Sequence, residues 1–126
     1  MNRFKKQCET SDNHKEPELR TRYYKANFQQ VFQTVEKILG TDPSVTVVSI
    51  SSEHGEISAE THDGIPAFLV VTVITLRPYE TAVDILLSSE KFYIAGAYPI
   101  IKNKVSDLYS KLGESLPAAG SGKYGN

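Results

Sequence analysis

The segment from Pro66 to Glu90 is the strongest indication of the fold class. It reads Pro-Ala-Phe-Leu-Val-Val-Thr-Val-Ile-Thr-Leu, then Arg-Pro-Tyr-Glu, then Thr-Ala-Val-Asp-Ile-Leu-Leu-Ser-Ser-Glu. Two β-rich runs flank a short connection that contains proline, which predicts a hairpin in an antiparallel sheet. The first run, Ala67 to Leu76, is apolar on both faces over much of its length and suits a central strand. The second run, Thr81 to Ser88, alternates, with Asp84 on its more solvated side.

The register of this hairpin is predicted from its loop. A two-residue loop at the proline places Ile74 opposite Val83. Because the first strand has apolar residues on both faces, the sequence leaves open whether helices bury one face or both. If Leu69, Val71 and Val73 lie on an uncovered face, they form an apolar patch that needs a partner or a second copy of the chain.

A second hairpin is predicted just upstream. Its strands run over about Val45 to Ser51 and Glu56 to Thr61, with a two-residue turn at His54-Gly55. This turn sets Ile50 opposite Ala59 and places the more apolar residues of both strands on one face.

Two segments with helical spacing flank the strands. Asn27 and Gln30 stand at the spacing of a capping box, apolar residues then recur at i, i+3, i+4 and i+7, and Gly40 supplies the stop. A second helix is predicted to begin near Pro99, since proline suits the first turn. Its apolar residues also recur at helical spacing, at Ile101, Val105, Leu108 and Leu112.

This order of elements predicts an α+β domain. Both apolar helix faces need the same sheet face, so we expect a two-layer sandwich: a four-stranded antiparallel meander with two helices on one face. A fifth strand over about Leu19 to Lys25 would pair on a sheet edge. The chain divides into a flexible N-terminal arm over residues 1–18, a single domain over 19–116 and a flexible tail over 117–126.

Composition and charge argue against several classes of protein. The 126 residues hold 14 Lys or Arg and 15 Asp or Glu, so the net charge of −1 gives no general attraction to nucleic acid or anionic lipid. Residues 1–26 are locally basic, with seven Lys or Arg against four Asp or Glu. Nucleic-acid contact by this arm is therefore a minor hypothesis.

The sequence also bears on location. No apolar run reaches the roughly 20 residues that span a bilayer, and no signal peptide is evident. The single cysteine, Cys8, cannot form an internal disulfide. We expect a cytoplasmic protein.

The sequence contains no pattern typical of a catalytic, metal or cofactor site. The three histidines lack the spacing of zinc ligands, the glycines form no phosphate-binding loop, and no serine lies in a nucleophile elbow. Glu56 and Glu60 share one sheet face because their spacing is even, and Asp84 is a candidate to join them. Because their strand is predicted to be an edge, solvent-facing carboxylates are the favoured interpretation. We therefore expect a protein that is not an enzyme and has no cofactor or metal.

Arg77, Tyr79, Tyr93 and Tyr98 form the most informative polar group. Arg77 and Tyr79 lie at the tip of the hairpin, whereas Tyr93 and Tyr98 follow its second strand. They are expected to form two sites at opposite ends of that strand. Arginine and tyrosine are enriched where proteins bind partners, so these four residues are our candidates for ligand or partner contact. The competing interpretation is that the tyrosines are partly buried and close the ends of the core.

Several segments together carry a family resemblance: Arg22-x-Tyr24, His54-Gly55-Glu56-Ile57-x-Ala59-Glu60, Val70-Val71-x-Val73 and Thr81-x-Val83-Asp84-Ile85. In this order, over about residues 20–116, they resemble small bacterial domains of unknown function, labelled in bacilli only as cytosolic proteins. The strands of this chain carry fewer arginines than that pattern. The resemblance implies the fold and a cytosolic location, and it transfers no catalytic residue.

Two main hypotheses for function follow. The first is a non-enzymatic protein-interaction or self-association module that uses the exposed sheet face or a strand edge, with a homodimer as one form. The second is a small-ligand-binding domain with a cavity between the second helix and the sheet, as in helix-grip folds. A polar group that points into a cavity would support the second hypothesis, whereas a solid core would count against it.

Overall fold

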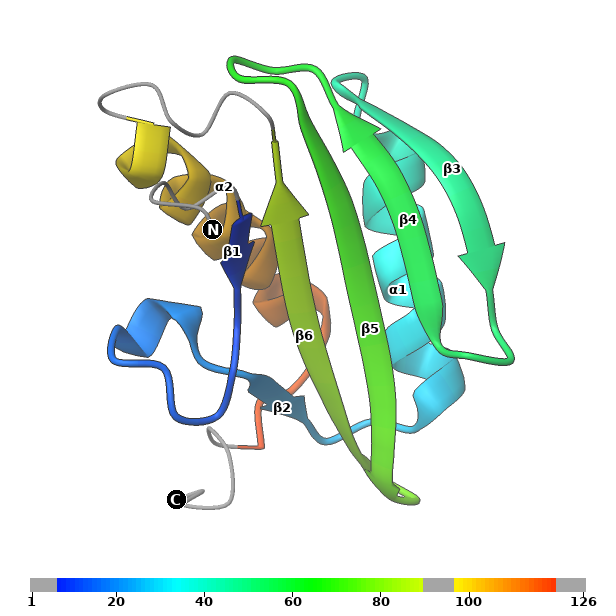
Figure 1. The fold of residues 1–126 in the computed structure, drawn as a ribbon. Helices are drawn as coiled ribbons and strands as arrows, with labels where there is room; N and C mark the ends of the chain where they lie inside the picture. Colours follow the sequence, from blue (N-terminus) through cyan, green and yellow to red (C-terminus); the bar gives the residue numbers. More distant parts are fainter. Residues whose placement is uncertain (1–6, 90–96, 120–126) are drawn as a thin grey trace.

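The computed structural model describes residues 7–89 and 97–119, and it places a single antiparallel sheet against two α-helices (Figure 1). The elements in chain order are β1 (Gln7–Glu9), the 3-10 helix η1 (Pro17–Leu19), β2 (Arg22–Tyr24), α1 (Phe28–Thr41), β3 (Val45–Ser51), β4 (Glu56–Thr61), β5 (Ala67–Arg77), β6 (Glu80–Ser88) and α2 (Ala97–Ser115). The predicted α+β class, with strands joined as a meander, is confirmed.

The sheet is a meander whose last strand is extended by two short N-terminal strands. Its order is β1-β6-β5-β4-β3, with every pair antiparallel, and β2 pairs with the other end of β6. The strand predicted over Leu19 to Lys25 is confirmed as β2. The prediction that β4 is an edge strand is wrong, because β4 pairs with β5 as well as β3 and leaves β3 at the edge (Figure 1).

The helices cover one face of the sheet, which we call the covered face. Ile57, Val71 and Ile85 lie side by side on it and are 0%, 0% and 1% exposed. The helix residues packed in the same core are also buried: Val31, Val35 and Leu39 of α1, and Ile101, Val105, Leu108 and Leu112 of α2. Burial of these apolar side chains from both layers is the main force that holds the layers together.

The β5–β6 hairpin has the predicted two-residue loop but not the predicted register. The pairing shifts around Leu76, so Ile74 lies opposite Ala82 and not opposite Val83. An extra residue in one strand moves every partner beyond it by one position. The register shift thereby changes which side chains of β5 and β6 are neighbours.

The β3–β4 loop spans residues 52–55, so it is longer than the predicted two-residue turn, and Ile50 pairs with Ile57, two positions from its predicted partner. Gly55 has a φ of +70°, and its carbonyl accepts a hydrogen bond from the Val73 N–H at 2.7 Å. The left-handed glycine thus bonds to β5, which fixes the longer turn against the sheet.

The first α-helix begins as predicted and ends later. The Asn27 side chain accepts from the Gln30 N–H at 2.8 Å, and the Gln30 side chain accepts from the Asn27 N–H at 3.1 Å, which confirms the capping box. The helix continues through Gly40, so the prediction that this glycine is the stop is wrong. It ends at Thr41, and the next residue, Asp42, has the extended backbone that is favoured before Pro43.

Residues 7–18 form a structured segment, which differs from the flexible arm expected over 1–18. They contribute β1 and part of η1, and Cys8 is 4% exposed. The Thr10 N–H donates to the Ile85 carbonyl at 3.0 Å, and the Ile85 N–H donates to Thr10 Oγ1 at 2.9 Å. Polar residues that show no periodicity in the sequence thus serve as hydrogen-bond partners for β6.

The start of the predicted flexible tail also bonds to the sheet. The Lys25 N–H donates to the Pro117 carbonyl at 2.8 Å, and the Ala119 N–H donates to the Tyr23 carbonyl at 2.8 Å. Residues 117–119 therefore lie along β2.

Candidate functional site

The sheet face opposite the helices, which we call the open face, carries an apolar strip. Phe68, Val70 and Ile74 point to this face from β5, with Thr72 between the last two, and Leu86 lies beside Val70 on β6. Phe68 and Ile74 are 41% and 42% exposed, while Val70 and Leu86 are half-buried. An apolar strip that is exposed to this extent is a candidate binding surface.

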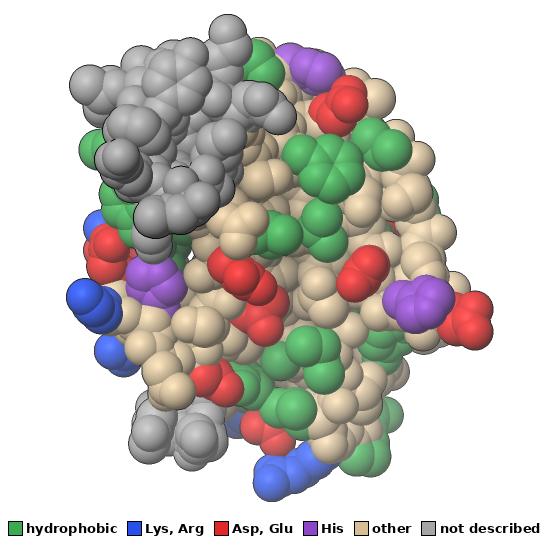
Figure 2. Space-filling view, in the orientation of Figure 1, with side chains coloured by type: hydrophobic (Ala, Val, Ile, Leu, Met, Phe, Trp, Pro, Cys, Tyr) green, Lys and Arg blue, Asp and Glu red, His purple; other side chains and the backbone are tan. Residues whose placement is uncertain are grey.

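Carboxylates flank the apolar strip on both sides. Glu56 and Glu60 lie on β4, with Glu60 beside Phe68, and Glu9 lies on β1 beside Leu86. The prediction that Glu56 and Glu60 share a face is confirmed, and Asp84 joins them in the next strand but one. Figure 2 shows acidic and apolar side chains mixed over this face, and the Lys and Arg visible in that view lie at its left and lower margins.

Asp84 differs from the other acids because it holds the N-terminal segment. Thr10 Oγ1 and Thr21 Oγ1 both donate to Asp84 Oδ1, at 2.8 Å and 2.6 Å. Nearby, the Tyr23 hydroxyl donates to Asp12 at 2.9 Å, and burial, followed by this hydrogen bond, raises the pKa of Tyr23 to about 12. The N-terminal segment thus occupies part of the β6 side and leaves the strip on β5 accessible.

The three residues that would form an apolar patch if their face were uncovered lie on the covered face. Leu69, Val71 and Val73 are 5%, 0% and 3% exposed and belong to the core. The apolar strip is built by their strand neighbours instead. Because successive side chains of a strand point to opposite faces, the choice between the two sets depends on the packing of the helices.

Two of the predicted contact residues lie at the β5–β6 hairpin tip. Arg77 and Glu80 form an ion pair with 3.0 Å between Nη1 and Oε1, and Tyr79 is 69% exposed. Tyr93 lies outside the described residues. The tip adjoins the end of β5, and Tyr79 is its most exposed large hydrophobic side chain.

Tyr98, the fourth predicted contact residue, ties α2 to the N-terminal segment. Its hydroxyl donates to Glu16 Oε2 at 2.8 Å, and the Lys102 ammonium bonds to Glu16 Oε1. Hydrogen bonds from Lys102 and then Tyr98 lower the pKa of Glu16, whereas burial, followed by the bond to Glu16, raises the pKa of Tyr98 to about 12. This contact matches the competing interpretation of tyrosines that close an end of the core.

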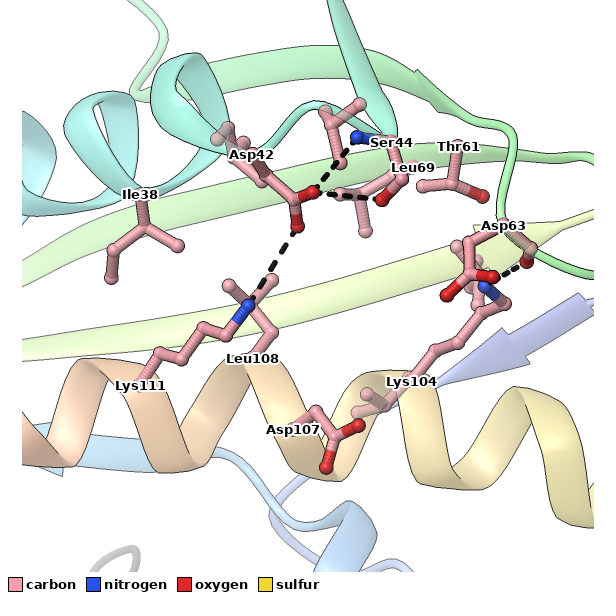
Figure 3. Close-up of a pocket in the computed structure, with 14 residues that line it drawn as sticks. Ile38, Asp42, Ser44, Thr61, Asp63, Leu69, Lys104, Asp107, Leu108 and Lys111 are labelled. Carbon is pink, nitrogen blue, oxygen red and sulfur yellow. Dashed lines mark hydrogen bonds and ion pairs between the residues drawn. The ribbon is translucent and has the colours of Figure 1, made fainter.

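A cleft of about 140 Å³ opens between α2, the C-terminal end of α1 and the covered face of the sheet (Figure 3). Its apolar part includes Leu69 of β5, Leu87 of β6 and Leu108 of α2, which are 5%, 1% and 8% exposed. The cleft therefore reaches the edge of the core.

Asp42 and Lys111 line one side of the cleft (Figure 3). Asp42 Oδ1 accepts from the Ser44 N–H at 2.9 Å and from the Ser44 hydroxyl at 2.8 Å, while Lys111 Nζ lies 3.7 Å from Asp42 Oδ2. The bond from the Ser44 N–H is the main cause that lowers the pKa of Asp42. Asp42 is thus a fixed, ionised carboxylate.

Lys104, Asp63 and Asp107 line the other side of the cleft. The Lys104 ammonium donates to the main-chain carbonyl of Asp63 (Figure 3). Over residues 7–89 and 97–119, the side-chain carboxylates of Asp63 and Asp107 have no hydrogen bond or ion pair with the protein. One ammonium bonded to a neutral oxygen and two carboxylates without partners therefore lie at one side of a cleft that leucines line in part.

Of the charged residues around the cleft, the sequence indicated only Asp63, as one of several acidic candidates. The expected cavity lay between the second helix, the strand over Ala67 to Leu76 and the segment over residues 91–98, most of which lies outside the described residues, whereas the cleft adjoins the C-terminal end of α1. The available signal was the spacing of Lys104, Asp107 and Lys111 at i, i+3 and i+7, beside the buried residues of the same helix. Charges at such positions are usually a solvated helix face.

In the part of the chain that the structure describes, no group of three or more His, Cys, Asp or Glu is placed to hold a metal ion. None of the helices in that part is long and apolar enough to cross a membrane. No family model and no curated protein matches the chain. The resemblance to bacterial domains of unknown function stays a prediction.

Proposed function

We propose that this chain is a cytosolic, non-enzymatic protein-interaction module whose open face binds a basic amphipathic helix of a partner protein. The observation that carries the proposal is the apolar strip of Phe68, Val70, Ile74 and Leu86 with carboxylates on both sides. A helix that places apolar residues on this strip would be flanked by carboxylates on each side, which lysine and arginine complement.

The packing on the covered face supports this kind of partner. There, α1 and α2 lay apolar stripes against Val71 and its neighbours, so a helix across the sheet is already the packing mode of this fold. On the open face the strip is narrower and its margins are charged. A partner helix would therefore gain contact area from the strip and specificity from the charges.

The same charges argue against a second copy on this face. Stacking two open faces would bring the carboxylates of Glu9, Glu56 and Glu60 from both copies into one contact. Like charges in a desolvated contact are unfavourable. Arg77 and Tyr79 remain candidates for partner contact at the hairpin tip.

The test uses a synthetic probe and the full chain labelled with ¹⁵N. The probe is a helical peptide of about 14 residues, with leucines on one side and lysines on both flanks; its control has glutamates in place of the lysines. We expect saturable amide shifts along β5 and β6 with the lysine peptide alone. Glu56→Gln combined with Glu60→Gln should weaken binding about tenfold, whereas Glu114→Gln on α2 should not change it.

Two results would overturn the proposal. One is peptide-induced shifts that lie elsewhere or that persist unchanged in the Glu56→Gln, Glu60→Gln variant. The other is a dimer, seen by analytical ultracentrifugation, that dissociates when Phe68 is replaced by Ser, since the open face would then bind a second copy.

A second candidate function is small-ligand binding in the cleft. The observation that favours it is the cleft of about 140 Å³, which leucines line in part and which has Lys104 and Asp107 at its margin. Native mass spectrometry of the protein, purified gently from its own cells, tests this candidate. A retained small-molecule mass would support it, and its absence over repeated mild preparations would count against it.

A further inference from the structure

If the cleft binds a ligand, as the second candidate function proposes, the charges around it specify what kind of molecule would fit. Lys104 bonds to a neutral carbonyl, so its positive charge and its remaining donor hydrogens are available to an anionic group. In the described part of the chain, the carboxylates of Asp63 and Asp107 have no partner and are available to a cationic group. Asp42, by contrast, is already bonded to Ser44 and lies near Lys111.

The size of the cleft limits the apolar part of such a molecule. Its volume is about 140 Å³. An apolar cavity of roughly 150 Å³ accepts a molecule of the size of benzene, whereas drug-sized ligands need about 300 Å³ or more. A branched aliphatic group that contacts Leu69, Leu87 and Leu108 fits this limit.

The geometry points to a small zwitterion with an apolar side group, the chemical class of a free aliphatic amino acid. Its carboxylate would bond to Lys104, its ammonium to Asp63 or Asp107, and its side group would lie against the leucines. Each charged group of the ligand then has a complement on the protein, which limits the desolvation cost of binding.

Ligands with one charge complement the cleft less well. An aliphatic carboxylate would leave Asp63 and Asp107 beside the buried part of the ligand without a cation. An aliphatic amine would leave Lys104 without an anion. Both would lose a charge-assisted hydrogen bond that the zwitterion makes.

The experiment compares three molecules that share one side group. They are L-leucine, 4-methylpentanoate, which is leucine without its amine, and 3-methylbutylamine, which is leucine without its carboxylate. Each is titrated into the ¹⁵N-labelled full chain while amide shifts are recorded. We expect L-leucine to shift the signals of Asp63, Lys104 and Leu108 in a saturable way. Each analogue should bind at least about tenfold more weakly than L-leucine.

Two variants test which charged residue of the cleft contacts which charged group of the ligand. Lys104→Met should weaken the binding of L-leucine about tenfold without weakening that of 3-methylbutylamine, whereas Asp107→Asn combined with Asp63→Asn should weaken the binding of L-leucine without weakening that of 4-methylpentanoate. Lys37→Met, on the exposed side of α1, is the matched control and should change nothing. These residues are polar and lie outside the buried core, so the variants should keep the unfolding temperature within about 4 °C.

The possible failures differ in what they overturn. If 4-methylpentanoate or 3-methylbutylamine binds as tightly as L-leucine, the cleft is a ligand site but the zwitterion assignment is wrong. If L-leucine causes no saturable shift up to about 10 mM, the assignment is also wrong. Should native mass spectrometry then detect a retained small molecule, the second candidate function stands without it; should it detect none, both fail.

Discussion

Strand β5 is apolar on both faces, yet its two faces have different roles. Leu69 and Val71 lie under the helices and are 5% and 0% exposed, whereas Phe68, directly before Leu69, is 41% exposed on the open face. The two sets have similar hydrophobicity in the sequence, so hydrophobicity did not decide their burial. One face of β5 is thus part of the core, while the other, with carboxylates at its margins, is the surface that we propose for a partner.

The largest expected difference between the faces is in stability. We expect Leu69→Ala to lower the free energy of unfolding by about 2–5 kcal/mol, because it leaves a cavity in the core. Phe68→Ala, one residue away, should cost about 1 kcal/mol or less, since its side chain is partly solvated in the folded state. Urea denaturation of both variants measures the difference, and equal losses would contradict the assignment of the faces.

A matched pair of glycines tests how closely the loops approach the sheet. Gly55 and Gly64 have φ of +70° and +75°, but only at Gly55 would an added Cβ collide with a neighbour, the Val73 carbonyl oxygen. Gly55→Ala should therefore destabilise the fold by about 2–4 kcal/mol. Gly64→Ala should cost about 1 kcal/mol, the conformational part alone. Thermal unfolding monitored by circular dichroism compares them, and similar melting temperatures would mean that the turn at residues 52–55 does not bond to β5 as described.

Two acids of the open face are expected to behave differently. Asp84→Ala removes the acceptor of the Thr10 and Thr21 hydroxyls and should cost about 1.5–3 kcal/mol. Glu56→Ala, on the same face but exposed, should stay within about 0.5 kcal/mol of the parent. Hydrogen exchange should show faster exchange at Thr10 and Ile85 in the first variant. If protection there is unchanged, Asp84 does not hold the N-terminal segment.

The smallest expected effect concerns alkaline pH and both faces of β2. Burial raises the pKa of Tyr24 on the covered face to about 12, and burial with the bond to Asp12 does the same for Tyr23 on the open face. A phenol is neutral when protonated, so stability is unaffected below about pH 10 and falls as the pH rises from about 10 toward 12. For Tyr24 the loss is about 1 kcal/mol at pH 11.

Urea denaturation between pH 8 and pH 11 checks this expectation. Tyr24→Phe should show a shallower loss of stability with pH than the parent. Identical slopes would show that the Tyr24 hydroxyl does not titrate against folding.

The sequence predicted the elements better than their partners. The capping box at Asn27, the apolar stripe of α2 and the short strand at Arg22–Tyr24 are local patterns, and each was confirmed. The register of both hairpins was predicted wrongly. A bulge or a longer turn costs little locally and is selected by packing across the sheet, which a single strand's pattern does not contain.

In the candidate sites, too, features of a single strand were predicted and contacts between distant segments were not. Glu56 and Glu60 were placed on one face correctly because period-two spacing is a property of the strand itself. The contact between Lys104 and Asp63 was missed because the two residues are separated by about forty residues in the sequence and meet only through the fold. Tyr98 was singled out for its type, but its partner Glu16 lies in a segment that was expected to be flexible.

The fold class, the order of the elements from β2 to α2 and the acidic character of the strands followed from the sequence, because these depend on periodicity and composition over short distances. The tertiary structure alone decided which face of β5 is covered, where Asp84 finds its hydroxyl partners and which charges surround the cleft. These features depend on contacts between distant segments, whose free energies are set by the complementarity of two surfaces and not by either sequence alone.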